Sequence, residues 1–270
     1  MPFINLHNHS AFSDGTLAPE HLARVVKKAG IDFFALPAVA AAGEVLDPFY
    51  APNPGHILSK TSVTAQKFKY DGGAKFNTTQ LMETIYYAID PSWTLFLDGS
   101  NTWVDPEIGG KYEIRSWDAG IGYFFMPTET TSLDLELYYT ESKPEDADIY
   151  KTLFFYGRYD FMKDNDVKPF IGLTYARGLH QITKSDDSIT AFAGAWKKFD
   201  NVLLRGDVIT DYDPDEPEAT DISLRLETGY QFNEKLAIDL YGSYNVYSHY
   251  QQAADLDSSF GGGIMVRYEF

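Results

Sequence analysis

His7 and His9, near the start of the chain, come closest in residue type and spacing to a metal site. They follow a short apolar run at residues 3–6, and side chains two positions apart in a strand share one face. Paired imidazoles can hold divalent metals, which generate hydroxide and neutralise phosphate. A catalytic metal needs at least three protein ligands and an open position, whereas this pair supplies two. We therefore expect at most weak metal chelation here, with no catalytic residue and no cofactor assigned.

Residues 1–36 resemble the opening of a PHP (polymerase and histidinol phosphatase) domain. The resemblance rests on FINLHNHS at 3–10, FSDGT at 12–16 and KKAGID at 27–32. It implies a βαβ opening and roles for His7 and His9 as two ligands of a metal cluster that hydrolyses phosphoesters. The sequence departs from the family after Leu36, where Pro-Ala-Val-Ala replaces Thr-Asp-His-Asp, and later ligands have no counterpart. The expectation is a truncated βαβ fragment without independent folding, and a metal-dependent phosphoesterase is the remote alternative.

Two further histidines, His180 and His249, lie in or beside loops and are the remaining candidates for hydrolytic chemistry. Serine or aspartate paired with histidine is the constellation that a hydrolase needs. The neighbouring residues that could complete it are Asp186, Asp187, Ser248 and Asp255. Because histidines and loop carboxylates often fall near one another by chance, the chain is expected not to be an enzyme, with a hydrolase kept as an alternative.

The composition of the 270 residues narrows the functional classes. With 22 basic and 39 acidic residues the formal net charge is −17, which argues against a nucleic-acid partner. The absence of cysteine excludes disulfides, Cys-zinc sites and a thiol nucleophile. No apolar run reaches the roughly 18 residues of a membrane-spanning helix. The aromatic content of 16% is nevertheless high, and an acidic, aromatic-rich chain can still belong in a membrane as a β-barrel.

From residue 37 onward the chain shows the two-residue periodicity of strands. The sequence predicts about twelve strands, at 56–70, 76–89, 92–104, 113–125, 132–141, 149–162, 167–178, 188–199, 201–212, 221–232, 235–248 and 259–270. Apolar residues such as Leu224 and Leu226 alternate with polar ones. A soluble sandwich and a membrane barrel both alternate in this way, so periodicity alone leaves both open.

Three features favour the barrel. Short connections, such as 90–91, 199–201 and 232–234, alternate with longer polar ones, which matches the loop asymmetry of outer-membrane barrels. Aromatic clusters, including Tyr86–Tyr87 and Tyr138–Tyr139, are expected to form girdles at the two membrane interfaces. The last strand carries alternating outward residues up to the terminus: Ile264, Val266, Tyr268 and Phe270.

That terminal strand resembles the last strand of Gram-negative outer-membrane β-barrel proteins, and the resemblance covers about residues 43–270. It implies an all-β fold: a closed, antiparallel, up-and-down transmembrane barrel, here predicted over residues 55–270. It also implies an outer-membrane location, a lipid bilayer as environment, and recognition of the terminal strand by the barrel-assembly machinery.

Residues 37–54 form a linker that contains a signal-peptide-like remnant. Ala40 and Ala42 fit a small-residue cleavage site, but Asp32 interrupts the apolar core before it. We therefore expect a composite chain, in which a PHP-like fragment precedes an outer-membrane protein.

A barrel of twelve strands has a bore between those of side-chain-filled small barrels and open porins. Inward-facing charges of both signs are then expected to line it. These predicted lumen-lining charges are Arg205, Asp207, Arg225, Glu227, Asp239, Arg267 and Glu269. The sequence predicts a narrow channel for small solutes, and the alternatives are a non-conducting structural or adhesion barrel and an outer-membrane hydrolase.

Overall fold

The computed structural model describes residues 53–70, 75–107, 110–145, 149–162, 167–179, 187–212, 220–249 and 256–270. The strands are β1 Ile57–Tyr70, β2 Lys75–Ala88, β3 Trp93–Pro106, β4 Tyr112–Thr128, β5 Thr131–Pro144, β6 Tyr150–Phe161, β7 Lys168–Gly178, β8 Asp187–Phe199, β9 Val202–Tyr212, β10 Thr220–Gln231, β11 Leu236–His249 and β12 Leu256–Glu269. The PHP-like fragment with His7 and His9, and the remnant up to residue 52, lie outside the described residues.

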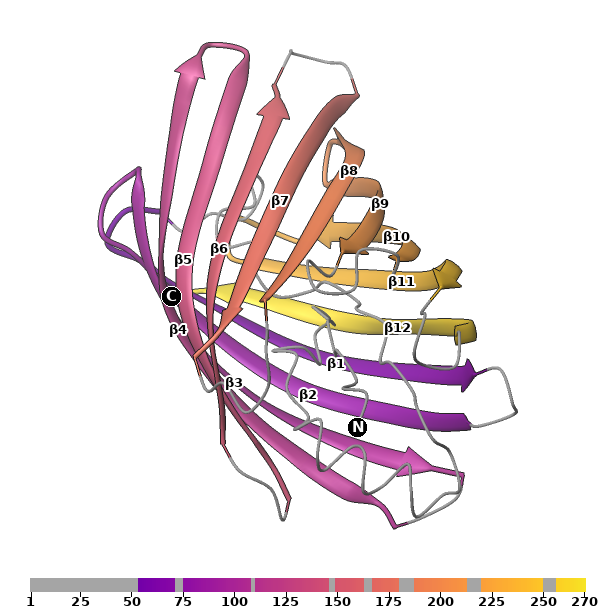
Figure 1. Ribbon diagram of the computed structural model, residues 1–270. Coiled ribbons are helices and arrows are strands. Elements are labelled where there is room, and N and C mark those ends of the chain that lie inside the picture. The colour runs from indigo at the N-terminus through magenta and orange to yellow at the C-terminus, as the bar shows by residue number, and fades with distance from the viewer. Residues whose placement is uncertain are drawn as a thin grey trace.

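The twelve strands close into one antiparallel barrel, in which each strand pairs with its neighbours in sequence. Closure is made between the first and last strands, where Leu58 stands opposite Glu269 and Lys60 opposite Arg267. Figure 1 shows β12, in yellow, lying beside β1, in indigo. A closed sheet has no unpaired edge. The predicted fold is therefore confirmed, and the soluble sandwich is excluded.

The connections differ in length between the two ends of the barrel. At the end that holds Phe270, residues 129–130 and 200–201 suffice to link neighbouring strands. Asp200 takes a positive φ of 50° in the second of these turns, a conformation that aspartate tolerates well. Connections at the other end include 179–186 and 213–219. Two predicted loops, 105–112 and 142–148, are shorter than expected because β3 and β5 continue to Pro106 and Pro144.

The side chains of each strand alternate between an exposed apolar outer face and a buried inner face. On β10, Leu226 has 70% of its surface exposed, whereas Asp239 on the neighbouring strand β11 is 0% exposed. Soluble proteins usually place such residues the other way round. The pattern suits a wall whose outer side meets hydrocarbon and whose inner side is polar. Within the ranges that the structure covers, no helix is long and apolar enough to cross a membrane.

The terminal strand β12 follows this alternation. The side chains of Ile264, Val266, Tyr268 and Phe270 are all exposed. On the opposite face of the same strand, Arg267 and Glu269 are buried. The outer face of the closing strand is therefore a continuous apolar surface that ends in an aromatic residue.

Candidate functional site: the barrel interior

A network of ion pairs covers the inner face of β9 to β12, and Asp207 on β9 lies at its centre. The Asp207 carboxylate accepts a hydrogen bond of 2.8 Å from Arg205 on the same strand. It also accepts two from Arg225 on β10, at 3.0 and 2.5 Å. Bidentate hydrogen bonds of this kind between a guanidinium and a carboxylate are strong and fix the geometry of both groups. Asp207 therefore holds two cationic side chains against one wall.

The network continues through Glu227 on β10 to the closing strand. Glu227 lies 4.0 Å from Arg205 and 3.2 Å from Arg267 of β12. Arg267 also donates a hydrogen bond of 2.7 Å to Asp239 on β11. Six of the seven charges that the sequence placed in the lumen thus form one connected set, with three arginines and three carboxylates. Each named pair lies within a strand or between strands no more than two apart, so these pairs run along the wall.

Glu269, the seventh of those charges, lies apart from the network at the seam between β1 and β12. Its Oε1 accepts a hydrogen bond of 2.7 Å from the Asn53 side chain. The Nδ1 atom of His56 lies 2.8 Å from the same oxygen. His56 and Asn53 therefore help to tie the start of β1 to the end of β12.

A further pair, Arg158 and Asp160 on β6, extends the charged surface and was not singled out from the sequence. Arg158 donates a 2.7 Å hydrogen bond to Asp160, and the Trp196 indole donates another of 2.9 Å to the same carboxylate oxygen. The guanidinium groups of Arg158 and Arg205 lie 4.3 and 4.8 Å from the Phe170 ring centroid. The spacing of Arg158 and Asp160 repeats that of Arg205 and Asp207, a signal the sequence did carry.

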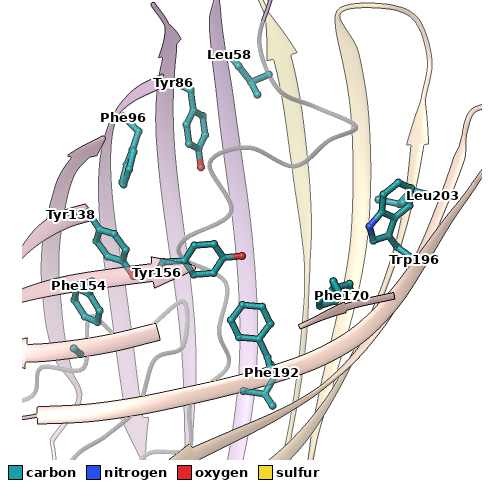
Figure 2. Packing of buried hydrophobic residues seen from close by; sticks show 12 residues of the cluster. Leu58, Tyr86, Phe96, Tyr138, Phe154, Tyr156, Phe170, Phe192, Trp196 and Leu203 are labelled. Carbon is teal, nitrogen blue, oxygen red and sulfur yellow. The ribbon is translucent and has the colours of Figure 1, made fainter. Parts of the chain in front are cut away.

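The inner face of β2 to β6 carries a row of aromatic rings. Neighbouring centroids are 6.0 Å apart for Tyr86 and Phe96, 5.7 Å for Phe96 and Tyr138, and 4.7 Å for the stacked pair Tyr138 and Phe154. Figure 2 shows these four rings following one another across the wall. Gly120 of β4 stands between Phe96 and Tyr138 in register. Its lack of a side chain lets the two rings meet over the β4 backbone.

This row corrects the prediction that the aromatic clusters are interfacial girdles. Tyr87 and Phe155 are exposed on the outer face, but their neighbours Tyr86 and Phe154 are buried inside. Two adjacent residues of a strand must point to opposite faces. Only one member of each adjacent aromatic pair can therefore contact lipid.

Carboxylates lie beside the aromatic row on the same inner face. Asp98 of β3, Asp118 of β4, and Asp134 and Glu136 of β5 are all buried. Asp98 stands opposite Asp118 and accepts a 3.3 Å hydrogen bond from Thr84. The interior thus combines an arginine–carboxylate wall with an aromatic and acidic wall.

Of the loop residues considered for hydrolysis, the structure describes Asp187 on β8 and Ser248 and His249 on β11. His249 ends β11 opposite Thr220, and Ser248 is buried opposite Asp221. Asp187 accepts a 2.7 Å hydrogen bond from the Tyr175 hydroxyl. His180, Asp186 and Asp255 lie outside the described residues. Among the residues with described positions, no group of three or more histidines, aspartates or glutamates could hold a metal ion.

Comparisons with known proteins show the fold. No protein-family model matches the sequence, and no curated protein matches it. Among solved structures, an outer membrane channel from Pseudomonas putida F1 superimposes with a TM-score of 0.66 at 9% identity, covering 83% of this chain and 99% of the channel. The translocator domain of the autotransporter NalP from Neisseria meningitidis gives 0.52 at 12% identity, covering 80% and 88% of the two chains. The KdgM porin in complex with disordered oligogalacturonate gives 0.50 at 9% identity, covering 78% and 99%. The chain therefore has the β-barrel fold that these outer-membrane proteins share.

Proposed function

We propose that the protein spans the outer membrane of a Gram-negative bacterium and acts as a narrow, porin-like channel for small solutes. The observation that carries the proposal is the inversion of the barrel: exposed apolar side chains outside, and ion pairs such as Asp207 with Arg225 inside. Charged groups inside a barrel are stable when they are hydrated or paired, and the inner wall of this barrel carries paired ones. Two of the structures with this fold are described as a channel and a porin, which supports the same function here.

The strands that these ion pairs connect favour a channel over a non-conducting barrel. A barrel plugged by salt bridges requires pairs that cross the bore. The pairs of Arg205, Arg225 and Arg267 instead join groups on the same or nearby strands. The apolar outer face of β12, with its terminal Phe270, is the surface that we propose the barrel-assembly machinery recognises.

Conductance measurements in planar lipid bilayers test this proposal. Purified full-length protein, shown to be folded by its SDS resistance and altered gel mobility before boiling, is expected to give discrete current steps in KCl. Arg225→Ala is expected to raise the unit conductance for potassium, because it removes a positive group from the inner face. The matched variant Leu224→Ala, one residue away on the outer face, is expected to leave it unchanged. Folded, membrane-inserted protein that gives no current steps would refute the channel.

A further inference from the structure

Acidic groups predominate on the inner face of the barrel. The buried charged side chains of the described strands comprise ten carboxylates and four cationic groups. The carboxylates are Asp98, Asp118, Asp134, Glu136, Asp160, Asp207, Asp211, Asp221, Asp239 and Glu269, and the cationic groups are Lys60, Arg158, Arg205 and Arg267. The half-buried Arg225 and Glu227 add one charge of each sign. A low-dielectric wall focuses the field of such a surplus into the lumen, so cations are concentrated there.

Each of the three arginines of the network contacts a carboxylate of the same network. Arg205 and Arg225 bind Asp207, and Arg267 binds Asp239 and Glu227. The network itself, with three arginines and three carboxylates, is therefore close to neutral. The negative surplus lies instead on β3 to β5 and at Asp211 and Asp221 on β9 and β10.

On β3 to β5 a row that contains carboxylates lies directly beside the row of rings. One row of directly opposite residues runs from Lys60 through Thr84, Asp98 and Asp118 to Thr140. The next inward row, two residues away on each strand, is the aromatic row with Tyr86, Phe96 and Tyr138. The two rows are only two residues apart on each strand. A molecule that touches a ring of the aromatic row therefore lies close to a carboxylate of the neighbouring row.

The protein's own Lys60 already places an ammonium group on this surface. Its Nζ atom lies 4.3 Å from the centroid of the Tyr86 ring, at the start of both rows. Cations are attracted to the faces of aromatic rings, and more strongly where water is excluded. Farther along the rows, Thr140 is 1% exposed, and its Oγ1 has no hydrogen-bond partner in the part of the chain that the structure describes. A hydroxyl oxygen in that position can accept a hydrogen bond from an N–H donor.

We propose that the wall of β2 to β6 binds organic ammonium cations as they pass through the channel, an inference that rests on the proposed function. The rings take the charged headgroup and any planar apolar part, and Asp98 and Asp118 neutralise the charge. An organic carboxylate would meet like charges on this wall, which oppose its binding. An uncharged aromatic compound could stack on the rings. It would, however, displace water from the neighbouring carboxylates without supplying a positive charge, which opposes its binding. Figure 2 shows the rings on which such a molecule would lie.

Bilayer recordings with defined salts provide the test. Under a KCl gradient, the reversal potential is expected to show that potassium permeates better than chloride. Benzylammonium chloride is expected to reduce the potassium current at concentrations where potassium benzoate does not. Selectivity for chloride, or equal block by benzoate and benzylammonium, would overturn the proposal.

Substitutions then locate the site. Asp98→Asn combined with Asp118→Asn is expected to bring the potassium-to-chloride ratio towards one and to weaken benzylammonium block about tenfold, equivalent to ~1.4 kcal/mol. Phe96→Leu with Tyr138→Leu is expected to weaken the block while retaining potassium selectivity. The matched control removes two acids from the outer face of β4 and β5, Glu113→Gln with Glu141→Gln, and is expected to change neither property. An equal loss in this control would overturn the assignment to the inner wall.

A barrel that conducts nothing would refute the proposed function, and the binding surface is then tested separately. Titration of benzylammonium chloride into the detergent-solubilised full-length barrel, followed by calorimetry, is expected to show saturable binding. The Asp98→Asn, Asp118→Asn variant is expected to lose it. Absence of saturable binding to the folded wild-type barrel would refute the inference.

Discussion

A Gly120→Val variant is expected to unfold at clearly lower urea concentration than the wild-type barrel. A Cβ atom at Gly120 would lie 2.4 Å from Cζ of Phe96 and 2.5 Å from Cβ of Tyr138. Phe96 can rotate, but the Tyr138 Cβ is fixed by the β5 backbone, so the strands themselves would have to separate. Overpacking of this kind costs about 1–3 kcal/mol or more. The measurement is the urea midpoint in lipid vesicles, followed by tryptophan fluorescence.

Gly99→Val is the matched control for the loss of a strand glycine. Gly99 lies on the neighbouring strand β3, and a Cβ there meets no atom within 4 Å. Valine suits strands well, so this variant is expected to keep the wild-type midpoint. Equal midpoints for the Gly120 variant and the wild type would contradict the close approach of the two rings over β4.

Asp207→Asn is expected to destabilise the barrel by about 3–5 kcal/mol, the cost of removing one partner from a buried ion pair. The side chain of Asp207 is fully buried and contacts two guanidinium groups, those of Arg205 and Arg225. Without the carboxylate, both positive charges face each other inside the lumen. The urea midpoint measures the loss, and adding Arg225→Met to the Asp207 variant is expected to recover part of it.

The exposed pair Lys69 and Asp257 supplies the comparison for this ion pair. Their side chains are 48% and 41% exposed, and exposed pairs contribute about 1 kcal/mol or less. Asp257→Asn is therefore expected to leave the urea midpoint almost unchanged. A similar loss in the Asp207 and Asp257 variants would show that water screens the interior network as fully as the surface pair.

The fold could be predicted largely from the sequence because successive side chains of a strand point to opposite faces. In a membrane barrel one face is apolar and the other polar, so the two kinds of residue alternate along the sequence. Leu224 and Leu226 alternate with Arg225 along β10, so the apolar and polar faces were separable without coordinates. All twelve strands were placed within three residues of their observed ends. Closure was predicted from the alternation of short and long connections and from the terminal aromatic strand, and the β1–β12 ladder confirms it.

The interior contacts were harder to predict because they depend on the stagger between neighbouring strands and on the curvature of the barrel wall. Arg267 on β12 reaches Glu227 on β10, two strands away, and strand periodicity gives no information on such diagonal partners. The Phe170 ring contacts Arg158 and Arg205 from different strands for the same reason. The inward position of Tyr86 and Phe154, in contrast, was available from the sequence, since adjacent aromatic residues cannot share one face of a strand.

The central claim is that the apolar face of this barrel meets lipid while the charged face meets water. The chain has no cysteine, so single-cysteine variants carry a nitroxide label at one defined place. Labels are introduced on β10 and β11 at Leu224 and Leu240, which are exposed, and at Ser223 and Ser243 on the opposite face. In lipid vesicles, electron paramagnetic resonance is expected to show oxygen access at Leu224 and Leu240, and access of a water-soluble nickel complex at Ser223 and Ser243. Nickel access at the leucines, or protection of the leucines from both reagents as in a packed protein core, would contradict the account.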